Sequence, residues 1–194
     1  MHIAIEGMDG VGKTTICKEL ENRTGFEFID KPLRFLFSEN ASYTEYYRIR
    51  DYVNSREDRK FTSWFYGLGS LYMYDYFRGK NIITDRHLLS NYAWSGTDDS
   101  MPVFDTLLEL MGVPDFTVIV YALKGAITER LKERNNQDPD LEKMESSETI
   151  YDKMEYFAKY AKMPYMKIDT SKLSPGSVCD IIEDKLISEG IISE

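Results

Sequence analysis

The chain has 194 residues, enough for one domain that buries about 70 % of the surface its unfolded chain exposes. Its formal net charge of −9, with the basic residues scattered along the chain, argues against nucleic acid as a partner. Two distant cysteines exclude a disulfide framework and a metal-ligand spacing. There is neither a leader nor an apolar run of membrane-spanning length, so we expect a cytoplasmic protein without a membrane partner.

The first fifteen residues combine a short strand, a glycine-rich turn and the start of a helix. The strand covers residues 2–6, and the turn reads as glycine, four residues, then Gly-Lys-Thr. Glycines let backbone N–H groups approach phosphate oxygens, and the positive end of the new helix faces the same oxygens. This pattern predicts a phosphate-binding loop made of Gly7, Asp9, Gly10, Val11, Gly12, Lys13, Thr14 and Thr15.

Two of these residues carry charge and metal chemistry. Lys13 reaches the β- and γ-phosphates of a nucleotide, and Thr14 offers its hydroxyl to Mg²⁺. We therefore expect ATP and Mg²⁺ as cofactors. The alternative is a glycine-rich turn that matches by accident, but a strand before the pattern and a helix after it argue against that interpretation.

Strands alternate with helices along the rest of the chain. This alternation predicts an α/β fold with a parallel sheet of about five strands and helices on both faces, the three-layer α/β/α arrangement of P-loop NTPases. We see no linker or repeat and expect one domain over residues 1–194. Further strands are expected at residues 26–29, 81–85, 116–123 and 165–168, and helices at 13–23, 41–78 in two parts, 126–134, 149–162 and 174–187.

Aromatic side chains recur at three- and four-residue steps within residues 41–78. Core packing is the ordinary explanation for most of them, and the remainder could line a pocket for a flat ring. Trp64 and Phe65, together with the later Trp94, are our candidates for stacking on a nucleotide base.

A phosphate loop of this kind needs a second acid near the metal, at the end of a buried strand. The strand at 116–123 has no acid within it or just after it, whereas the strand at 81–85 ends in Asp85. Asp85 is therefore the metal candidate beside Thr14, the alternative being an exposed strand-end acid. Arg86 would project beside the same phosphates. His87 is interpreted as structural, because phosphoryl transfer needs no imidazole.

Arg130 and Arg134 stand four residues apart before a polar stretch. Two arginines that lead into such a stretch are typical of a lid that closes over transferring phosphate, so we predict a lid at about residues 135–147 and catalytic roles for both arginines. The alternative is a solvated helix face on which Glu129 and Glu133 accompany the arginines.

The chain resembles the thymidylate kinase family in two motifs that are specific to that family. They are Glu6-Gly7-x-Asp9-Gly10-x-Gly12-Lys13-Thr14-Thr15 and Asp85-Arg86-His87-x-x-Ser90-x-x-Ala93-x-x-Gly96. The resemblance extends at coarse spacing over nearly the whole chain. It implies a nucleoside monophosphate kinase that transfers the γ-phosphoryl group of ATP to a deoxynucleoside monophosphate, with dTMP as the leading acceptor, and it suggests a homodimer.

The resemblance also implies roles for individual residues. Asp9 would meet the 3′-hydroxyl of the acceptor sugar, and Arg86 would bridge the donor and acceptor phosphates. Thr170 and Lys172 would lie near the donor adenine. Ser90 of the second motif is a further substrate-binding candidate.

The departures from the family pattern lie on the acceptor side. The family carries Arg-Glu-Pro, an arginine and Ala-Tyr-Gln-Gly where this chain has Asp30-Lys31-Pro32, Gly69 and Ala93-Trp94-Ser95-Gly96. Lys31 or Arg34 is the candidate to replace a lost acceptor-phosphate arginine, although a lysine lacks the guanidinium fork. We therefore expect an altered acceptor pocket that is less selective for thymine.

Two other functions remain open. A deoxynucleoside kinase, which phosphorylates a nucleoside 5′-hydroxyl, would explain the missing arginines. A catalytically inactive nucleotide-binding regulator is the second, but the intact Lys13, Thr14, Asp85 and Arg86 argue against it. A GTPase would need Asn-Lys-x-Asp to recognise guanine, and the sequence does not contain it.

Overall fold

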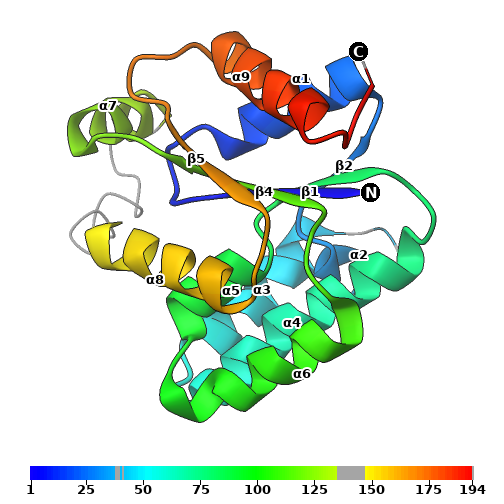
Figure 1. Cartoon of the computed structure of the whole chain (residues 1–194). Coiled ribbons are helices and arrows are strands. Elements are labelled where there is room, and N and C mark those ends of the chain that lie inside the picture. The colour runs from blue at the N-terminus through cyan, green and yellow to red at the C-terminus, as the bar shows by residue number, and fades with distance from the viewer. Residues whose placement is uncertain (38–39, 41, 135–146, 194) are drawn as a thin grey trace.

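The computed structural model describes residues 1–37, 40, 42–134 and 147–193, and it contains one five-stranded sheet (Figure 1). The strands follow the order β2-β3-β1-β4-β5, and neighbouring strands are parallel. Their bounds are β1 His2–Glu6, β2 Glu27–Ile29, β3 Ile82–Asp85, β4 Phe116–Tyr121 and β5 Tyr165–Asp169. The predicted three-layer P-loop fold is confirmed.

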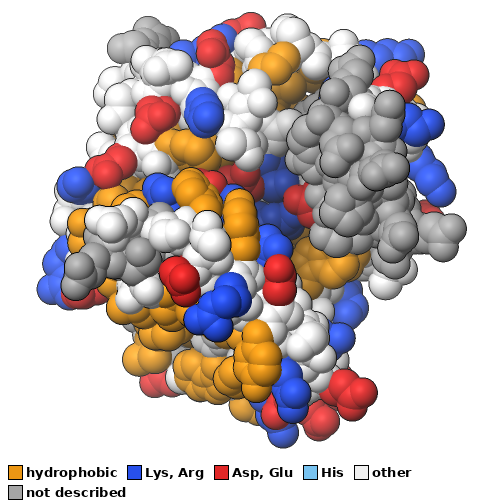
Figure 2. Space-filling model, turned by 180° about the vertical axis from the view of Figure 1, so that it is seen from behind, with side chains coloured by type: hydrophobic (Ala, Val, Ile, Leu, Met, Phe, Trp, Pro, Cys, Tyr) orange, Lys and Arg blue, Asp and Glu red, His pale blue; other side chains and the backbone are white. Residues whose placement is uncertain are grey.

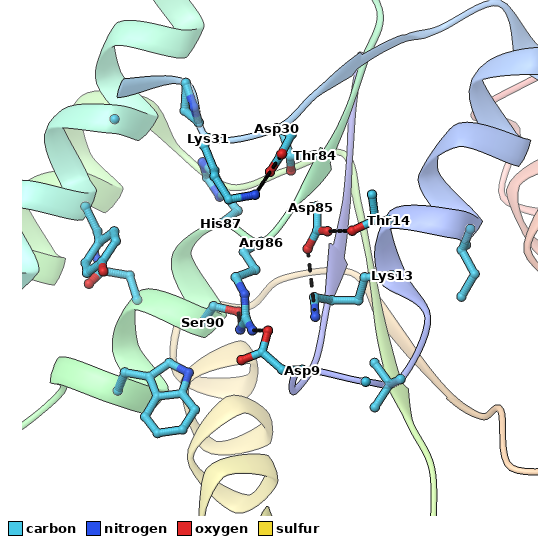
Figure 3. Close-up of a pocket in the computed structure, with 18 of the residues that line it drawn as sticks. Asp9, Lys13, Thr14, Asp30, Lys31, Thr84, Asp85, Arg86, His87 and Ser90 are labelled. Carbon is cyan, nitrogen blue, oxygen red and sulfur yellow. Dashed lines mark hydrogen bonds and ion pairs between the residues drawn. The ribbon is translucent and has the colours of Figure 1, made fainter. Parts of the chain in front are cut away.

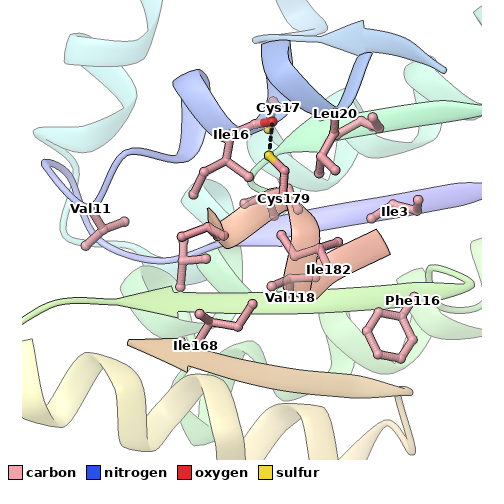
Figure 4. Close-up of a cluster of buried hydrophobic side chains, with 14 of the residues drawn as sticks. Ile3, Val11, Ile16, Cys17, Leu20, Phe116, Val118, Ile168, Cys179 and Ile182 are labelled. Atoms are coloured by element: carbon pink, nitrogen blue, oxygen red, sulfur yellow. Dashed lines mark hydrogen bonds between the residues drawn. The ribbon is translucent and has the colours of Figure 1, made fainter. Parts of the chain in front are cut away.

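Helices cover both faces of the sheet, which is why β1 and β4 are nearly continuous runs of buried apolar residues. One face carries α1 (Lys13–Thr24), α7 (Lys124–Arg134) and α9 (Pro175–Ser188) (Figure 1). Their apolar side chains form a single cluster with the sheet, in which Ile16, Cys17, Cys179 and Ile182 pack against Ile3 (Figure 4). Both cysteines are buried and free.

The other face packs against a larger group of helices. The group consists of α4 (Arg59–Tyr76), α5 (Leu88–Ser95), α6 (Met101–Met111) and α8 (Ser147–Tyr160). The helices α2 (Leu33–Phe37) and α3 (Tyr43–Asn54) pack on α4 and complete this side of the molecule. A short 3₁₀ turn, η1 (Asp98–Ser100), leads into α6.

The periodicity of the sequence did not predict α2, α5 or α6. In α5 every residue except Trp94 is buried, so the helix has no polar face and no 3.6-residue pattern to detect. The region at 41–78 does form two helices. The second helix begins after Asp58, whose carboxylate accepts the N–H groups of Lys60 and Phe61 at 2.9 and 3.4 Å.

The predicted lid at about 135–147 lies outside the described residues, except that α8 begins at Ser147. The lid therefore stays a prediction, as does the single domain over residues 1–194. Among the helices that the structure describes, none is long and apolar enough to cross a membrane.

Candidate active site

The phosphate-binding loop lies between β1 and α1, and its backbone can be built only with glycine at key positions. Gly7 has a φ of 149°, and a Cβ atom there would stand 2.2 Å from the carbonyl oxygen of Val120. Gly10 has a φ of 81°, and its Cβ would stand 2.6 Å from Ile127. The loop therefore packs directly against β4 and α7, with the N-terminus of α1 facing the cavity.

Lys13, Thr14 and Asp85 meet at the mouth of this loop (Figure 3). The Nζ atom of Lys13 donates to the carbonyl of Met8 at 2.8 Å and lies 3.9 Å from the Asp85 carboxylate. The Thr14 hydroxyl donates to the other oxygen of that carboxylate at 2.5 Å. A hydroxyl and a carboxylate side by side are hard oxygen donors of the kind Mg²⁺ prefers when substrate phosphates and water complete its shell. The donor set at the loop fits that metal.

Burial lowers the pKa of Lys13 to about 8, with the nearby Arg86 guanidinium as the second cause. The carboxylates of Asp85 and Asp9 act in the opposite direction and do not compensate. The ammonium group is therefore poorly stabilised by the protein alone. A polyphosphate bound in the loop would supply the negative charge that it lacks.

This pKa gives an expected pH dependence. Because only protonated Lys13 binds phosphate well, kcat/KM for Mg·ATP should fall about tenfold per pH unit above pH about 8. The fall in kcat should begin at higher pH, because bound phosphate raises the pKa of the lysine. Initial rates between pH 6.5 and about 10 measure both profiles, and a Lys13→Arg variant with residual activity should lose the alkaline fall, since arginine stays charged. A kcat/KM profile that is flat above pH 8 would contradict the assignment.

Arg86 lies across the loop in a conformation that most residues avoid, with a φ of 77°. Its guanidinium donates to the Gly7 carbonyl at 3.0 Å, to the Ser90 hydroxyl at 3.3 Å and to the Asp9 carboxylate at 2.7 Å. The parallel pairing of β1 and β3 creates this contact, because it sets Ile5 opposite Asp85 and brings both strand ends to the loop. The structure thus brings Asp9, Asp85 and Arg86 together, as the sequence predicts.

Glu6 fixes the segment that carries Arg86, a function that the sequence analysis did not assign. Its carboxylate is fully buried and accepts the N–H groups of His87, Leu89 and Ser90 at 2.9, 3.0 and 3.1 Å, as well as the Ser90 hydroxyl. It therefore caps the N-terminus of α5 from the end of β1. Burial raises the pKa of Glu6, while the Ser90 hydrogen bond and the Arg86 charge oppose the rise.

Tyr151 is a second residue to which the sequence analysis assigned no function. Its hydroxyl accepts the N–H of Met8 at 3.2 Å and donates to the Val120 carbonyl at 3.1 Å, so it ties the loop to β4 and α8. Burial raises the pKa of Tyr151 to about 12, which keeps the hydroxyl protonated. The loop and Tyr151 are separated by more than 130 residues of sequence, and no local pattern could connect them.

The loop opens into a cavity of about 1240 Å³, larger than an ordinary small-molecule pocket and roomy enough for two nucleotides. In the view opposite to Figure 1 the surface is hollowed, with basic side chains at the base of the hollow (Figure 2). The cavity has two ends on either side of Lys13 and Arg86. We call them the α9 end and the α4 end after the helices that line them.

At the α9 end, Arg130 is held against the loop. Its guanidinium donates to the Thr170 carbonyl at 2.6 Å, to the Thr170 hydroxyl at 3.2 Å and to the Val11 carbonyl at 3.5 Å. Thr170 itself is buried and donates to Val11 at 3.2 Å. Lys172 is exposed and is not among the residues lining the cavity, and the side chain of Arg134 lies outside the described part of the chain.

At the α4 end the structure corrects two predicted stacking residues. Phe65 is buried in a core cluster with Leu33 and Tyr46, and its ring stacks on Phe37 with centroids 5.9 Å apart. Trp64 is 43 % exposed, and neither residue lines the cavity. The aromatic residues do lie on a helix, α4, as predicted. The orientation of this helix, however, points Phe65 into the core and Trp64 toward the surface instead of into the cavity.

Other predicted residues do reach the α4 end. Trp94, Ser90 and Lys31 line the cavity, and Lys31 forms an ion pair with Asp30 at 2.6 Å (Figure 3). Arg34 does not line it, and its guanidinium stacks on aromatic rings instead. The sequence analysis missed several polar residues of α3 and α4 that line the cavity, namely Arg50, Asp51, Asn54, Arg59 and Tyr66.

Two of the positions that depart from the family pattern, Gly69 and Ser95, offer no polar side chain to the cavity. A Cβ atom on Gly69 would stand 3.0 Å from Leu33, so Leu33 occupies the space beside this glycine. Ser95 is buried, donates to the Asn91 side chain at 2.8 Å and accepts from Ser63 at 2.9 Å. It does not line the cavity, and the family's glutamine therefore has no polar replacement at position 95.

Comparisons with known proteins agree with this geometry. A family model described as an AAA domain matches residues 3–151. The "probable thymidylate kinase" of Picrophilus torridus is 26 % identical over 189 residues, with 87 % of each chain covered. The thymidylate kinase of Nautilia profundicola is 26 % identical over 186 residues, covering 89 % of this chain and 90 % of the relative.

Two solved structures are similar over nearly the whole chain. The deoxyadenosine kinase of M. mycoides with bound dCTP is 25 % identical and gives a TM-score of 0.62, with 97 % of this chain and 100 % of that one covered. The thymidylate kinase of Candida albicans gives a TM-score of 0.69 at 16 % identity, covering 100 % of this chain and 95 % of that one. At that identity the second match shows the fold alone.

The match to the AAA domain model covers well over half of the chain and includes the phosphate loop, Asp85 and Arg86. The loop geometry, the paired strand ends and the thymidylate kinase relatives all point to transfer of a phosphoryl group. The chain belongs to the AAA domain family and is a phosphotransferase of the thymidylate kinase family.

Proposed function

We propose that the protein is an ATP- and Mg²⁺-dependent deoxynucleoside monophosphate kinase, with dTMP, converted to dTDP, as the leading acceptor. The observation that carries this proposal is the set of cationic side chains that line the α4 end, namely Lys31, Arg50, Arg59 and Arg86. Because Lys31 and Arg50 pair with Asp30 and Asp51 at 2.6 Å, Arg59 is the main candidate beside Arg86 for binding an acceptor phosphate. Basic side chains on the acceptor side suit a substrate that already carries a phosphate. The thymidylate kinase relatives support the same reading.

The enzyme would act by positioning the two substrates and neutralising charge, without forming a covalent intermediate with either of them. ATP would occupy the α9 end with its phosphates on the loop, and Mg²⁺, held by Thr14 and Asp85, would neutralise charge on them. Lys13 and Arg86 flank the point where the γ-phosphoryl group passes to the acceptor phosphate. Asp9 holds the Arg86 guanidinium at 2.7 Å and would meet the acceptor sugar.

A deoxynucleoside kinase is the second candidate, and a specific observation favours it. The helix α4 has Gly69 where the family carries an arginine, and Leu33 fills the space beside it. The similarity to a deoxyadenosine kinase points the same way. A nucleoside acceptor would leave Arg59 without a phosphate to bind, whereas Arg50 already pairs with Asp51 at 2.6 Å.

The family resemblance also suggests a homodimer, which we include in the proposal. Phe61, Trp64 and Leu68 form an exposed apolar row along α4, and a second copy of the chain could cover it. The row lies on the outer face of α4, because none of the three residues lines the cavity.

A panel of acceptors tests the function. We expect ADP production from Mg·ATP with deoxynucleoside monophosphates and not with the matching nucleosides. We also expect dUMP and dCMP to be used within about a hundredfold of dTMP in kcat/KM, because position 95 has no side chain that reads the base. Preference for nucleosides would replace the proposal with the second candidate, and a preference for dTMP above about a thousandfold would contradict the relaxed selectivity.

A further inference from the structure

The hydroxyl of Tyr151, on α8, links two strands just beyond the point where their pairing ends. The parallel pairing of β1 with β4 ends at Glu6 on β1. Immediately after it, the Tyr151 hydroxyl accepts the N–H of Met8 at 3.2 Å and donates to the carbonyl of Val120 at 3.1 Å. Because burial raises the pKa of Tyr151, the hydroxyl stays protonated and can make both bonds at once.

The N–H that Tyr151 holds belongs to the same peptide group as a carbonyl that holds Arg86. This peptide joins Gly7 to Met8. Its carbonyl oxygen accepts from the Arg86 guanidinium at 3.0 Å, while its N–H donates to Tyr151. A chain of hydrogen bonds therefore runs from the Val120 carbonyl through Tyr151 and one peptide group to Arg86.

The surroundings of this peptide offer no easy substitute for the Tyr151 bond. Met8 is 1 % exposed and Gly7 is buried, so water has little access to the peptide. Met8 and Tyr151 belong to one apolar cluster, together with Tyr92 and Phe157. A buried N–H without an acceptor is costly. Loss of the Tyr151 hydroxyl would therefore favour a rotation of the peptide toward another acceptor.

Gly7 makes such a rotation possible. A peptide plane turns when the ψ of the residue before it and the φ of the residue after it change, and Gly7 has no Cβ atom to resist the change. If the plane turned, the Gly7 carbonyl would leave the Arg86 guanidinium. The other acceptors of Arg86 are the side chains of Asp9 at 2.7 Å and Ser90 at 3.3 Å, which can move with it (Figure 3). The Gly7 carbonyl is the backbone anchor of the guanidinium.

We propose that Tyr151 positions Arg86 for phosphoryl transfer by fixing the orientation of the Gly7–Met8 peptide. This inference rests on the proposed function, because it concerns the transfer step in which Arg86 acts beside both phosphates. Tyr151 does not line the cavity, so it acts through the peptide and not on the substrates. It makes α8 a support of the active site, although the helix follows the phosphate loop by more than 130 residues.

A Tyr151→Phe variant tests the role, because it removes one oxygen atom and keeps the ring in its apolar cluster. We expect the single-turnover rate constant for phosphoryl transfer to dTMP to fall about tenfold, since small displacements of a catalytic group are costly. KM for ATP should stay near wild type. Tyr160→Phe is the matched control on the same helix. Its hydroxyl donates to Asp105 at 2.7 Å at the surface, and the variant should transfer at the wild-type rate.

A double-mutant cycle tests whether Tyr151 acts through Arg86. Arg86→Ala should lower the single-turnover rate constant at least about a hundredfold, because it removes a charge that stabilises the transferring phosphate. In that background Tyr151→Phe has no guanidinium left to displace, so the double variant should transfer at the rate of Arg86→Ala alone. A tyrosine that only stabilises the fold would lower the rate by the same factor in both backgrounds.

A gentler substitution covers the case in which Tyr151→Phe does not fold. In Tyr151→4-aminophenylalanine an amino group replaces the hydroxyl. This aromatic amine can still donate to the Val120 carbonyl, but it accepts the Met8 N–H poorly because its lone pair is delocalised into the ring. We expect the same loss of transfer rate, since the bond that orients the peptide is gone while the tie to β4 remains. Thermal unfolding identifies the temperature range in which each variant is folded, and all rates are measured within it.

The outcomes separate the two proposals. If the wild-type enzyme phosphorylates deoxynucleoside monophosphates but the substitutions of Tyr151 leave the transfer rate unchanged, or lower it by the same factor with and without Arg86, the role of Tyr151 is wrong and the proposed function stands. If wild type phosphorylates no deoxynucleoside monophosphate, the proposed function fails and this inference fails with it. A loss that is present with Arg86 and absent in Arg86→Ala would support the inference.

Discussion

A Lys13→Ala substitution should lower turnover at least a hundredfold while leaving the fold intact. The Nζ atom lies at the loop, 2.8 Å from the Met8 carbonyl and 3.9 Å from Asp85, where γ-phosphate oxygens would bind. Charged groups that stabilise a transferring phosphoryl group are typically worth about 10²-fold or more. The loop backbone does not depend on this side chain, because its shape is set by Gly7 and Gly10.

The measurement is steady-state ADP production at saturating Mg·ATP, together with thermal unfolding. Since burial lowers the pKa of Lys13, its charge is unfavourable in the free protein, and the alanine variant should be at least as stable as wild type. Lys18→Ala, an exposed lysine on the same helix, is the matched control and should behave as wild type in both assays. More than about a tenth of wild-type turnover in Lys13→Ala would contradict the assigned role.

A Glu6→Gln substitution should cost about 2–4 kcal/mol of unfolding free energy and lower kcat at least tenfold. The carboxylate accepts three backbone N–H groups from the start of α5 at 2.9 to 3.1 Å. The new amide can accept on one side only, and its NH₂ group would face a backbone donor. Because Arg86 directly precedes this turn, its guanidinium would lose its fixed position over the loop.

Urea unfolding and the kinetic assay measure the two effects separately. Glu19→Gln is the control, since Glu19 is 40 % exposed and makes a surface ion pair with Arg23 that should contribute at most about 1 kcal/mol. A Glu6→Gln enzyme with wild-type stability would show that the cap is not needed. Lost stability with unchanged kcat would show that it does not position Arg86.

The sequence by itself determined the parts of the site that are local. The loop from Gly7 to Thr15 is recognisable because strand, turn and helix follow one another, and because the φ values at Gly7 and Gly10 exclude other residues. Asp85 and Arg86 could be predicted because parallel strands bring their carboxyl ends to one edge of the sheet. The strands β1, β3 and β4 were predictable from their largely buried, apolar residues.

Only the tertiary structure decided the contacts made across long separations. Whether Glu6 is a strand residue or a cap depends on where α5 begins, and that helix has no periodicity because it is buried on nearly all sides. The phase of α4 against its neighbours decides that Phe65 packs in the core while Tyr66 lines the cavity. A hydrophobic pattern says which residues are buried but not what they are buried against. For this reason the partners of Tyr151 had to come from the packed structure.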